Sequence, residues 1–276
     1  MRPIRLSARW AASATLALLA VGCSGVSTTQ PGAIGLDRTQ YMSGLVSESA
    51  LEQEAGQQYS QLIAQAKAKG ALDRNAAQVQ RVSAISQKLI AQVGAFRPDA
   101  LKWKWEVHVL TVDEINAWCM PGGKIAVYTG LLNRIKPTDG ELAAVIGHEI
   151  SHALREHARE RVSQQMAANL GLSVLAIATG SDAAADLGGQ LTNVMFVLPN
   201  SRTHEAEADR MGVELAARAG YDPRAAITLW QKMAKASSGS APPEFLSTHP
   251  SAASRSANLE KAAEQVMPLY RKAAKP

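Results

Sequence analysis

The sequence predicts an α+β protein that is mainly helical, with a small antiparallel sheet beside a helix that carries an H-E-x-x-H motif. Three observations predict this class. Apolar residues recur at helical spacing in long segments, whereas segments near the middle of the chain alternate between apolar and polar residues as strands do. Alanine is plentiful, and aromatic residues make up only 5% of the chain. With 46% hydrophobic and 19% charged residues, the composition is typical of a folded protein and excludes disorder throughout.

Residues 1–22 predict the signal peptide of a lipoprotein. Three arginines and no acidic residue precede a short apolar run, which ends in small residues directly before Cys23. In a bacterial lipobox, which this pattern resembles, that cysteine is lipidated and begins the mature chain. A plain signal peptide cut nearby, with Cys23 unmodified, is the alternative. Because Ser24 rather than an aspartate follows, the pattern predicts an outer-membrane lipid anchor, with the protein facing the periplasm.

The charge of the mature chain argues against a polyanionic partner. The full chain has a net charge of +5, but without the three arginines of the signal peptide 26 basic residues remain against 24 acidic ones. The sequence contains no block of basic residues interleaved with aromatic ones, which argues against nucleic-acid binding. If Cys23 is lipidated, Cys119 is the remaining thiol and no intrachain disulfide forms.

Residues 23–45 predict a flexible tether, because they are rich in Ser, Thr, Gly and Pro. The domain that follows is expected to occupy residues 46–276. It begins with two helices over 48–70 and 73–95, the second with apolar residues at helical spacing. The alternation in residues 103–110 then predicts a half-buried strand.

The central part of the domain contains the predicted sheet and the helix beside it. Residues 115–132 predict two short strands around a Pro-Gly-Gly turn, and hence antiparallel pairing. A helix over 137–161 begins at a capping box, in which Thr138 and Glu141 satisfy the first backbone N–H groups. Residues 163–200 predict a loop or helix that packs over the functional site of the domain. This segment is too broken by glycine to span a bilayer. Further helices are predicted over residues 201–220, 223–236 and 255–267.

The stretch GHEISHALREH, residues 147–157, contains half of a candidate metal site. Residues four apart lie on one face of a helix, so His148 and His152 can direct both imidazoles to one ion. In H-E-x-x-H sites the glutamate, here Glu149, is not a ligand but takes a proton from water. A charged, solvated helix face is the alternative, but the motif follows an apolar run that predicts burial.

A catalytic zinc usually has three protein ligands, so a third must come from elsewhere. His157 lies nine residues after His148 and is expected to point away, because a continuous helix turns it to the opposite face. In THEAEADR, Glu205 and Asp209 are four apart and share a face, which favours Glu205 as the third ligand and Asp209 as an acceptor for a ligand histidine. On spacing alone, ordinary surface acids are an equally open interpretation. His204 is expected to be peripheral.

Four segments together resemble one protein family. GHEISHALREH, SRTHEAEADRMG, INAWCMPGGKIAVYTGLL and THPSAASR, from about residue 70 to 256, are similar to the zinc endopeptidases that comprise CAAX prenyl proteases, HtpX and mitochondrial Oma-type proteases. The likeness is closest to the small periplasmic lipoprotein members. It implies a gluzincin-type metallopeptidase with one Zn²⁺ per chain, with Glu149 as general base and as ligands His148, His152 and Glu205.

The resemblance also implies residues around the metal. The strand within KIAVYTG, with Ile125 and Val127, would be the edge that receives substrate, and Asn116 would match a family motif residue at its approach. His249 and Arg255 resemble the family's H-P-x-x-x-x-R element, in which the histidine stabilises the oxyanion or caps the zinc at rest. Either His249 or Arg255 is expected to hydrogen-bond the developing oxyanion.

These features predict a zinc-dependent endopeptidase of the bacterial envelope. Substrates are expected to be unfolded or misfolded envelope proteins, added as an extended strand to the sheet edge, with outer-membrane assembly machinery as a further partner. No transmembrane helix is predicted, which argues against prenylated CAAX substrates. A zinc-capped chaperone or assembly factor with little proteolysis is the second hypothesis.

Overall fold

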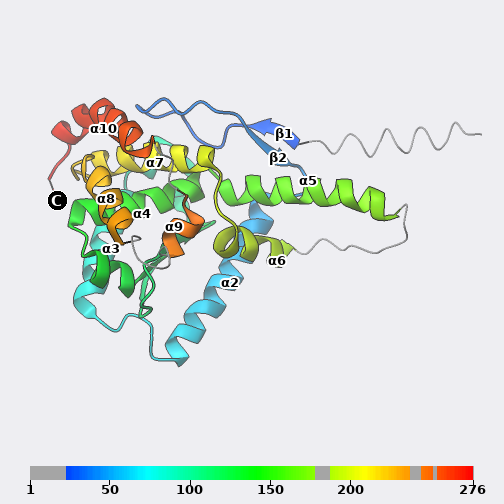
Figure 1. Ribbon diagram of the computed structural model, residues 1–276, viewed down its shortest axis with the longest axis horizontal. Coiled ribbons are helices and arrows are strands. Elements are labelled where there is room, and N and C mark those ends of the chain that lie inside the picture. Colours follow the sequence, from blue (N-terminus) through cyan, green and yellow to red (C-terminus); the bar gives the residue numbers. More distant parts are fainter. Residues whose placement is uncertain (1–22, 178–186, 237–243, 251–253, 276) are drawn as a thin grey trace, which may run out of the picture.

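The computed structural model describes residues 23–177, 187–236, 244–250 and 254–275, so the expected signal peptide lies outside the described residues. The fold is mainly helical with a small sheet beside the H-E-x-x-H helix, as predicted (Figure 1). Its strands are β1 (Cys23–Val26), β2 (Gln40–Ser43), β3 (Glu106–Leu110), β4 (Ala117–Met120) and β5 (Lys124–Tyr128). Its helices are α2 (Glu48–Ala68), α3 (Ala76–Ile90), α4 (Asp139–Leu154), α5 (His157–Ile177), α6 (Leu187–Thr192), α7 (Arg202–Arg218), α8 (Ala225–Ala236), α9 (Glu244–Thr248) and α10 (Arg255–Lys272). Short turns of 3₁₀ or π type lie at Val93–Ala95 (η1), Pro98–Lys102 (η2), Leu131–Ile135 (η3) and Asn193–Val197 (η4).

The sheet beside α4 has three strands in the order β3-β5-β4. β4 and β5 pair antiparallel around the predicted Pro-Gly-Gly turn, whereas β3 pairs parallel to β5 and makes the sheet mixed. This order places β5 in the centre and leaves β4 as an edge strand next to α4. The sheet therefore offers β4, not β5, to any strand that adds on the side of the candidate site.

The predicted capping box forms at the start of α4. The hydroxyl of Thr138 accepts from the backbone N–H of Glu141, and the Glu141 carboxylate accepts from the backbone N–H of Thr138. α4 ends at Leu154, however, and a second helix begins at His157, so the helix predicted over 137–161 is broken. Glu156 has a φ of 50°, in the left-handed region.

Buried ion pairs explain this break, which the helical pattern of the sequence does not show. The Arg155 side chain is completely buried and binds the carboxylate of Glu207 on α7. Glu156 accepts from Arg97 at 2.8 Å and from Arg159 at 2.8 Å. Contacts with residues distant in the sequence hold the turn, so helix propensity alone could not predict it.

Residues 23–45 do not form the expected tether. β1 and β2 pair antiparallel, and the chain between them packs against α7, with Ile34 and Leu36 buried in the main core (Figure 1). The Glu214 carboxylate on α7 accepts the backbone N–H groups of Ala33 and Ile34. A few apolar residues within a Ser/Thr/Gly-rich segment are sufficient for this packing, and composition did not reveal them.

Within the described ranges, no helix combines the length and the apolar character that crossing a bilayer requires. The side chain of Cys23, at the start of β1, is not described. Lipidation of Cys23 therefore stays a prediction.

Two glycines let α4 and α7 cross closely in the centre of the fold. A Cβ at Gly212 would lie 2.7 Å from the backbone nitrogen of His148 and 2.9 Å from the carbonyl carbon of Gly147. A Cβ at Gly147 would lie 3.0 Å from the carbonyl oxygen of Gly212. This close approach brings the histidines of α4 beside the acidic residues of α7.

Replacement of Gly212 by alanine is expected to destabilise the fold by about 1–3 kcal/mol, because the new methyl group collides with rigid backbone. It should also weaken metal binding, since the helices that carry the site must separate. Urea unfolding of the apo-protein and zinc titration measure the two effects. Gly56→Ala on α2 is the matched control, because its Cβ would meet nothing within 4 Å. Equal stability of Gly212→Ala and Gly56→Ala would contradict the proposed role of the crossing.

Candidate metal centre

Four side chains converge where α4, α7 and the end of α9 meet: His148, His152, Glu205 and His249. One ligand atom from each lies within 4.8 Å of all the others. The Nε2 atoms of His148 and His152 are 3.1 Å apart, and each lies 3.4 Å from a carboxylate oxygen of Glu205. Two imidazole nitrogens and a carboxylate oxygen are a typical donor set for catalytic zinc, so the residues present fit that ion.

Strong electrostatic coupling holds these groups together. Burial opposes ionisation of Glu205, but the positive charges of His249 and His148 hold the pKa of its carboxyl well below the usual range. Burial likewise disfavours a charged His148, but Glu205 and Asp209 raise its pKa to about 10. In His152 burial prevails, and its pKa is well below the usual value. A proton on His148 therefore compensates Glu205 in the absence of a metal, and a cation would take over this role.

The outer nitrogen of His148 is held by a carboxylate. Its Nδ1 lies 3.0 Å from Oδ1 of Asp209, one helical turn after Glu205 on α7. This contact agrees with the role predicted for Asp209. Because the carboxylate accepts the proton of Nδ1, the proton that a metal ion would displace from His148 is the one on Nε2, which faces the cluster.

His249 occupies the remaining side of the cluster. Its Nδ1 lies 3.0 Å from Oε1 of Glu205 and 3.2 Å from Nε2 of His148. Its ring stacks on Phe245 of α9 at 4.3 Å, and its Nε2 lies 3.6 Å from Oε1 of Glu149. This geometry places His249 as a potential fourth ligand, in the position that a catalytic site leaves open.

Glu149 lies beside the cluster without joining it. Its side chain is buried, and among the described residues its Oε1 has no hydrogen-bond partner. Burial raises the pKa of Glu149, opposed by the charges of His249 and His148. A buried, unpartnered carboxylate oxygen next to candidate metal ligands is suited to accept a proton from a reacting group.

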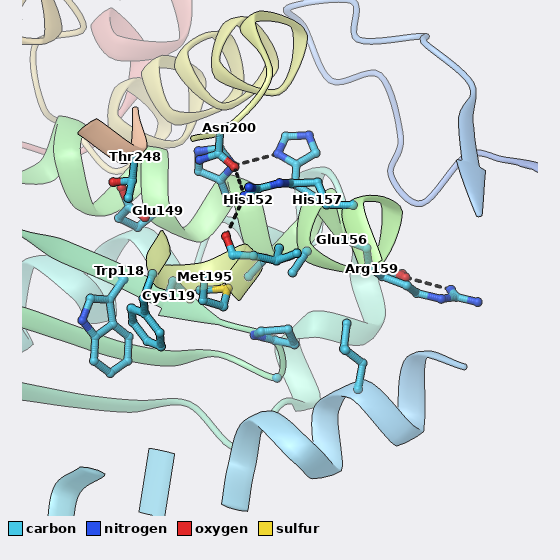
Figure 2. A pocket seen from close by; sticks show the side chains of 18 of the residues that line it. Trp118, Cys119, Glu149, His152, Glu156, His157, Arg159, Met195, Asn200 and Thr248 are labelled. Atoms are coloured by element: carbon cyan, nitrogen blue, oxygen red, sulfur yellow. Dashed lines mark hydrogen bonds and ion pairs between the residues drawn. The ribbon is translucent and has the colours of Figure 1, made fainter. Parts of the chain in front are cut away.

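The cluster opens into a cleft of about 320 Å³. Glu149, His152 and His249 line it from the side of the cluster, and Asn116 and β4 line it from the sheet. Figure 2 shows Glu149 and His152 on one side of the cleft and Trp118 and Cys119 on the other. Residues 194–196 of η4 also line it, which agrees with the prediction that part of 163–200 packs over the site.

The structure corrects the prediction of the substrate edge. Ile125 and Val127 lie on the central strand β5, fully buried and paired with β4 on one side and β3 on the other. Neither residue can offer a free strand edge. Asn116 does lie in the cleft, directly before β4, where its Oδ1 accepts from the backbone N–H of Ala117. Alternating hydrophobicity identified both strands but could not reveal which one lies at the edge.

Arg255 also differs from the prediction. It does not line the cleft but lies behind the cluster, where its Nη2 donates to Asp209 at 2.7 Å and Glu205 at 3.2 Å. Its guanidinium lies 3.2 Å from the ring centroid of Trp230. Arg255 therefore orients two carboxylates of the site, and of the two candidates for contact with an oxyanion only His249 reaches the cleft.

His157 is outside the metal cluster but in contact with it. Its Nδ1 lies 2.8 Å from Nδ1 of His152, and its Nε2 lies 2.9 Å from the Glu207 carboxylate. Helical periodicity did not indicate that His157 and Glu207 belong to the site, because the break between α4 and α5 brings His157 to a place that a continuous helix would not. The repeated acidic residues of HEAEAD were the available signal: Glu205 faces the cluster and Glu207 faces His157.

Comparison with known proteins agrees with this geometry. Residues 76–263 match the model of peptidase family M48. The chain is 42% identical over 169 residues to "Mitochondrial metalloendopeptidase OMA1" of Arabidopsis thaliana, covering 60% of this chain and 34% of that protein. It is 32% identical over 199 residues to "Beta-barrel assembly-enhancing protease" of Escherichia coli K12, covering 69% of this chain and 40% of that protein. The matched part is thus less than half the length of each of these relatives.

Proposed function

The chain belongs to peptidase family M48, and from this premise we propose that it is a zinc-dependent endopeptidase of the bacterial envelope that degrades unfolded or misfolded envelope proteins. The observation that carries the proposal is the buried Glu149 beside His148, His152 and Glu205, at the head of a cleft along a free sheet edge. A site that only binds a metal would not require this carboxylate oxygen, which has no hydrogen-bond partner among the described residues.

The mechanism assigns a role to each group. His148, His152 and Glu205 would hold a zinc ion, which when bound supplies Lewis acidity that polarises a scissile carbonyl and makes a water molecule more acidic. Glu149 accepts the proton of the attacking water at its carboxylate and passes it to the nitrogen of the leaving amine. Because burial raises its pKa, Glu149 is a better proton acceptor than an exposed carboxylate.

The edge strand β4 supports the choice of substrate. Among the described residues, β4 pairs with β5 on one side, and no strand pairs with its other side. An extended peptide that adds there forms main-chain hydrogen bonds, which select for an unfolded segment more than for a particular sequence. Such a segment is available in misfolded proteins and rare in folded ones.

The envelope location is supported by the N-terminal sequence and by one relative. The signal pattern before Cys23 favours an outer-membrane lipoprotein facing the periplasm. The similarity to a protein named beta-barrel assembly-enhancing protease favours outer-membrane assembly machinery as a partner. Labelling with a radioactive fatty acid tests the anchor: the label should appear in wild type and be absent from Cys23→Ser, and an unlabelled wild type would disprove it.

A zinc-capped chaperone with little proteolysis is the second candidate, and the position of His249 favours it. If His249 occupies the open metal position at rest, His249→Ala should increase cleavage of an unfolded protein about 5-fold or more, since a competent state that is rarely populated limits the rate. The three other ligands should still bind zinc stoichiometrically. Both are measured on the purified chain.

A decrease in cleavage by His249→Ala would indicate that His249 stabilises the oxyanion rather than caps the metal position. If His249 stabilises the oxyanion, His249→Ala should lower cleavage by about 10²–10³-fold. Phe245→Leu is the matched control, because it changes the ring that His249 stacks on but keeps the imidazole. Stoichiometric zinc with no cleavage in either wild type or His249→Ala would disprove the endopeptidase and leave the chaperone.

A further inference from the structure

A chain of buried polar contacts leads from the candidate ligand His152 away from the metal cluster. Nδ1 of His152 lies 2.8 Å from Nδ1 of His157, and Nε2 of His157 lies 2.9 Å from Oε2 of Glu207. His157 and Glu207 are 1% and 5% exposed. We infer that His157 and Glu207 are positioning residues that fix the ring tautomer of His152, so that its Nε2 presents a lone pair to the metal. This inference rests on the proposed function, because it concerns the same zinc site.

The proton positions follow from Glu207. Its carboxylate accepts from Arg38 Nε at 2.6 Å and from Arg155 Nη2 at 3.0 Å. Arg155 Nε also donates to Oε2 at 3.3 Å, so both oxygens of Glu207 accept from guanidinium groups and the side chain is held as the ionised carboxylate. An ionised carboxylate has no proton to donate. The contact with His157 is therefore a hydrogen bond that His157 donates from Nε2.

The positions of the ring protons of His157 and His152 follow from the number of protons that each imidazole carries. A neutral imidazole carries one ring proton, so His157 with its proton on Nε2 can only accept at Nδ1. The buried ring needs no charge of its own, because the positive charges of Arg38 and Arg155 already balance the carboxylates of Glu160 and Glu207. His152 must then donate from Nδ1, which leaves its Nε2 unprotonated. This atom lies 3.1 Å from Nε2 of His148 and 3.4 Å from Glu205, inside the cluster.

The two ligand histidines thus direct Nε2 toward the cluster by different routes. His148 donates Nδ1–H directly to the Asp209 carboxylate at 3.0 Å. In the described part of the chain no carboxylate contacts Nδ1 of His152, and the neutral ring of His157 transmits the preference of Glu207 instead. The break between α4 and α5 makes this possible, since a continuous helix would turn His157 away from His152.

A nearby carboxylate offers a matched control. Glu160 on α5 is 1% exposed, pairs with the same Arg38 at 2.8 Å, and lies 3.0 Å from Nε2 of His204. His204 stacks on His157 at 4.3 Å. However, among the described residues Nδ1 of His204 has no partner, so this second pair ends before it reaches the metal cluster. Replacement of Glu160 or of Glu207 by glutamine removes a comparable buried charge. Only Glu207 belongs to the chain of contacts from Glu207 through His157 to His152, which we call the relay.

The test compares Glu207→Gln with Glu160→Gln in the purified chain, by competition with a chromogenic chelator for zinc. Glu207→Gln should weaken zinc binding by about 10–100-fold, because its amide can donate to His157 and reverse the relay. Glu160→Gln should change it less than about 3-fold. In ¹⁵N spectra of the apo-protein, His152 should carry its proton on Nδ1 in wild type and Glu160→Gln, and on Nε2 in Glu207→Gln.

A double substitution separates the relay from general packing. His157→Phe keeps a ring against His204 but removes both nitrogens, so it should weaken zinc binding to a similar degree as Glu207→Gln. The double variant Glu207→Gln/His157→Phe should bind zinc no more weakly than the single variant with the lower zinc affinity, because the two residues act through one contact. Additive losses, or equal zinc affinities of Glu207→Gln and Glu160→Gln, would overturn the relay. A wild type without zinc affinity would instead overturn the proposed function.

Discussion

Glu149→Gln is expected to lower kcat/KM for cleavage of an unfolded protein by about 10²–10⁴-fold, the usual contribution of a general base. Glutamine has nearly the same shape but cannot take up the proton of the attacking water. Zinc content should not change, because Glu149 is outside the metal cluster. Among the described residues Oε1 of Glu149 has no hydrogen-bond partner, so the substitution breaks no hydrogen bond at this atom.

The measurement needs a variant that changes the charge of the cleft but not its chemistry. Glu114 lines the same cleft and is exposed, so Glu114→Gln removes one negative charge of the cleft outside the metal cluster. Its kcat/KM should stay within about 3-fold of wild type, because an exposed charge is screened by solvent. A Glu149→Gln protein with full zinc and undiminished cleavage would exclude Glu149 as the base.

Local sequence patterns predicted much of the candidate site. The four-residue spacing of His148 and His152 places both on one face of α4, and that of Glu205 and Asp209 does the same on α7. The capping box at Thr138 fixed the start of α4. These features depend on residues within one helix, where sequence separation and distance in space are directly related.

The predictions that the structure contradicts all concern contacts between segments that are distant in the sequence. β4 rather than β5 forms the sheet edge because β3 pairs with β5, and no pattern within β5 encodes that neighbour. The break after Leu154 depends on ion pairs of Arg155 with α7 and of Glu156 with Arg97. Both features matter for function, since one determines where a peptide can add and the other brings His157 to His152.

Glu205→Gln should reduce zinc affinity by more than about 100-fold, which is the upper range for changes in residues that only orient ligands. The amide keeps the size of the side chain but loses the charge that a divalent ion requires. It also removes the main cause that raises the pKa of His148, so the apo-cluster should lose its bound proton near neutral pH. Chelator competition measures the first effect and histidine NMR titration the second.

A buried glutamate on the same helix provides the control for this loss. Glu214 on α7 is completely buried. Its carboxylate accepts the backbone N–H groups of Ala33 and Ile34 and a hydrogen bond from Arg218. Glu214→Gln should therefore lower the free energy of unfolding while leaving zinc affinity within about 3-fold of wild type, since its contacts lie on the side of the N-terminal segment. If both variants lost zinc equally, general weakening of α7 would explain the loss. A loss confined to Glu205→Gln requires a carboxylate at that one position, which is the property that separates a ligand from an acidic residue of the same helix.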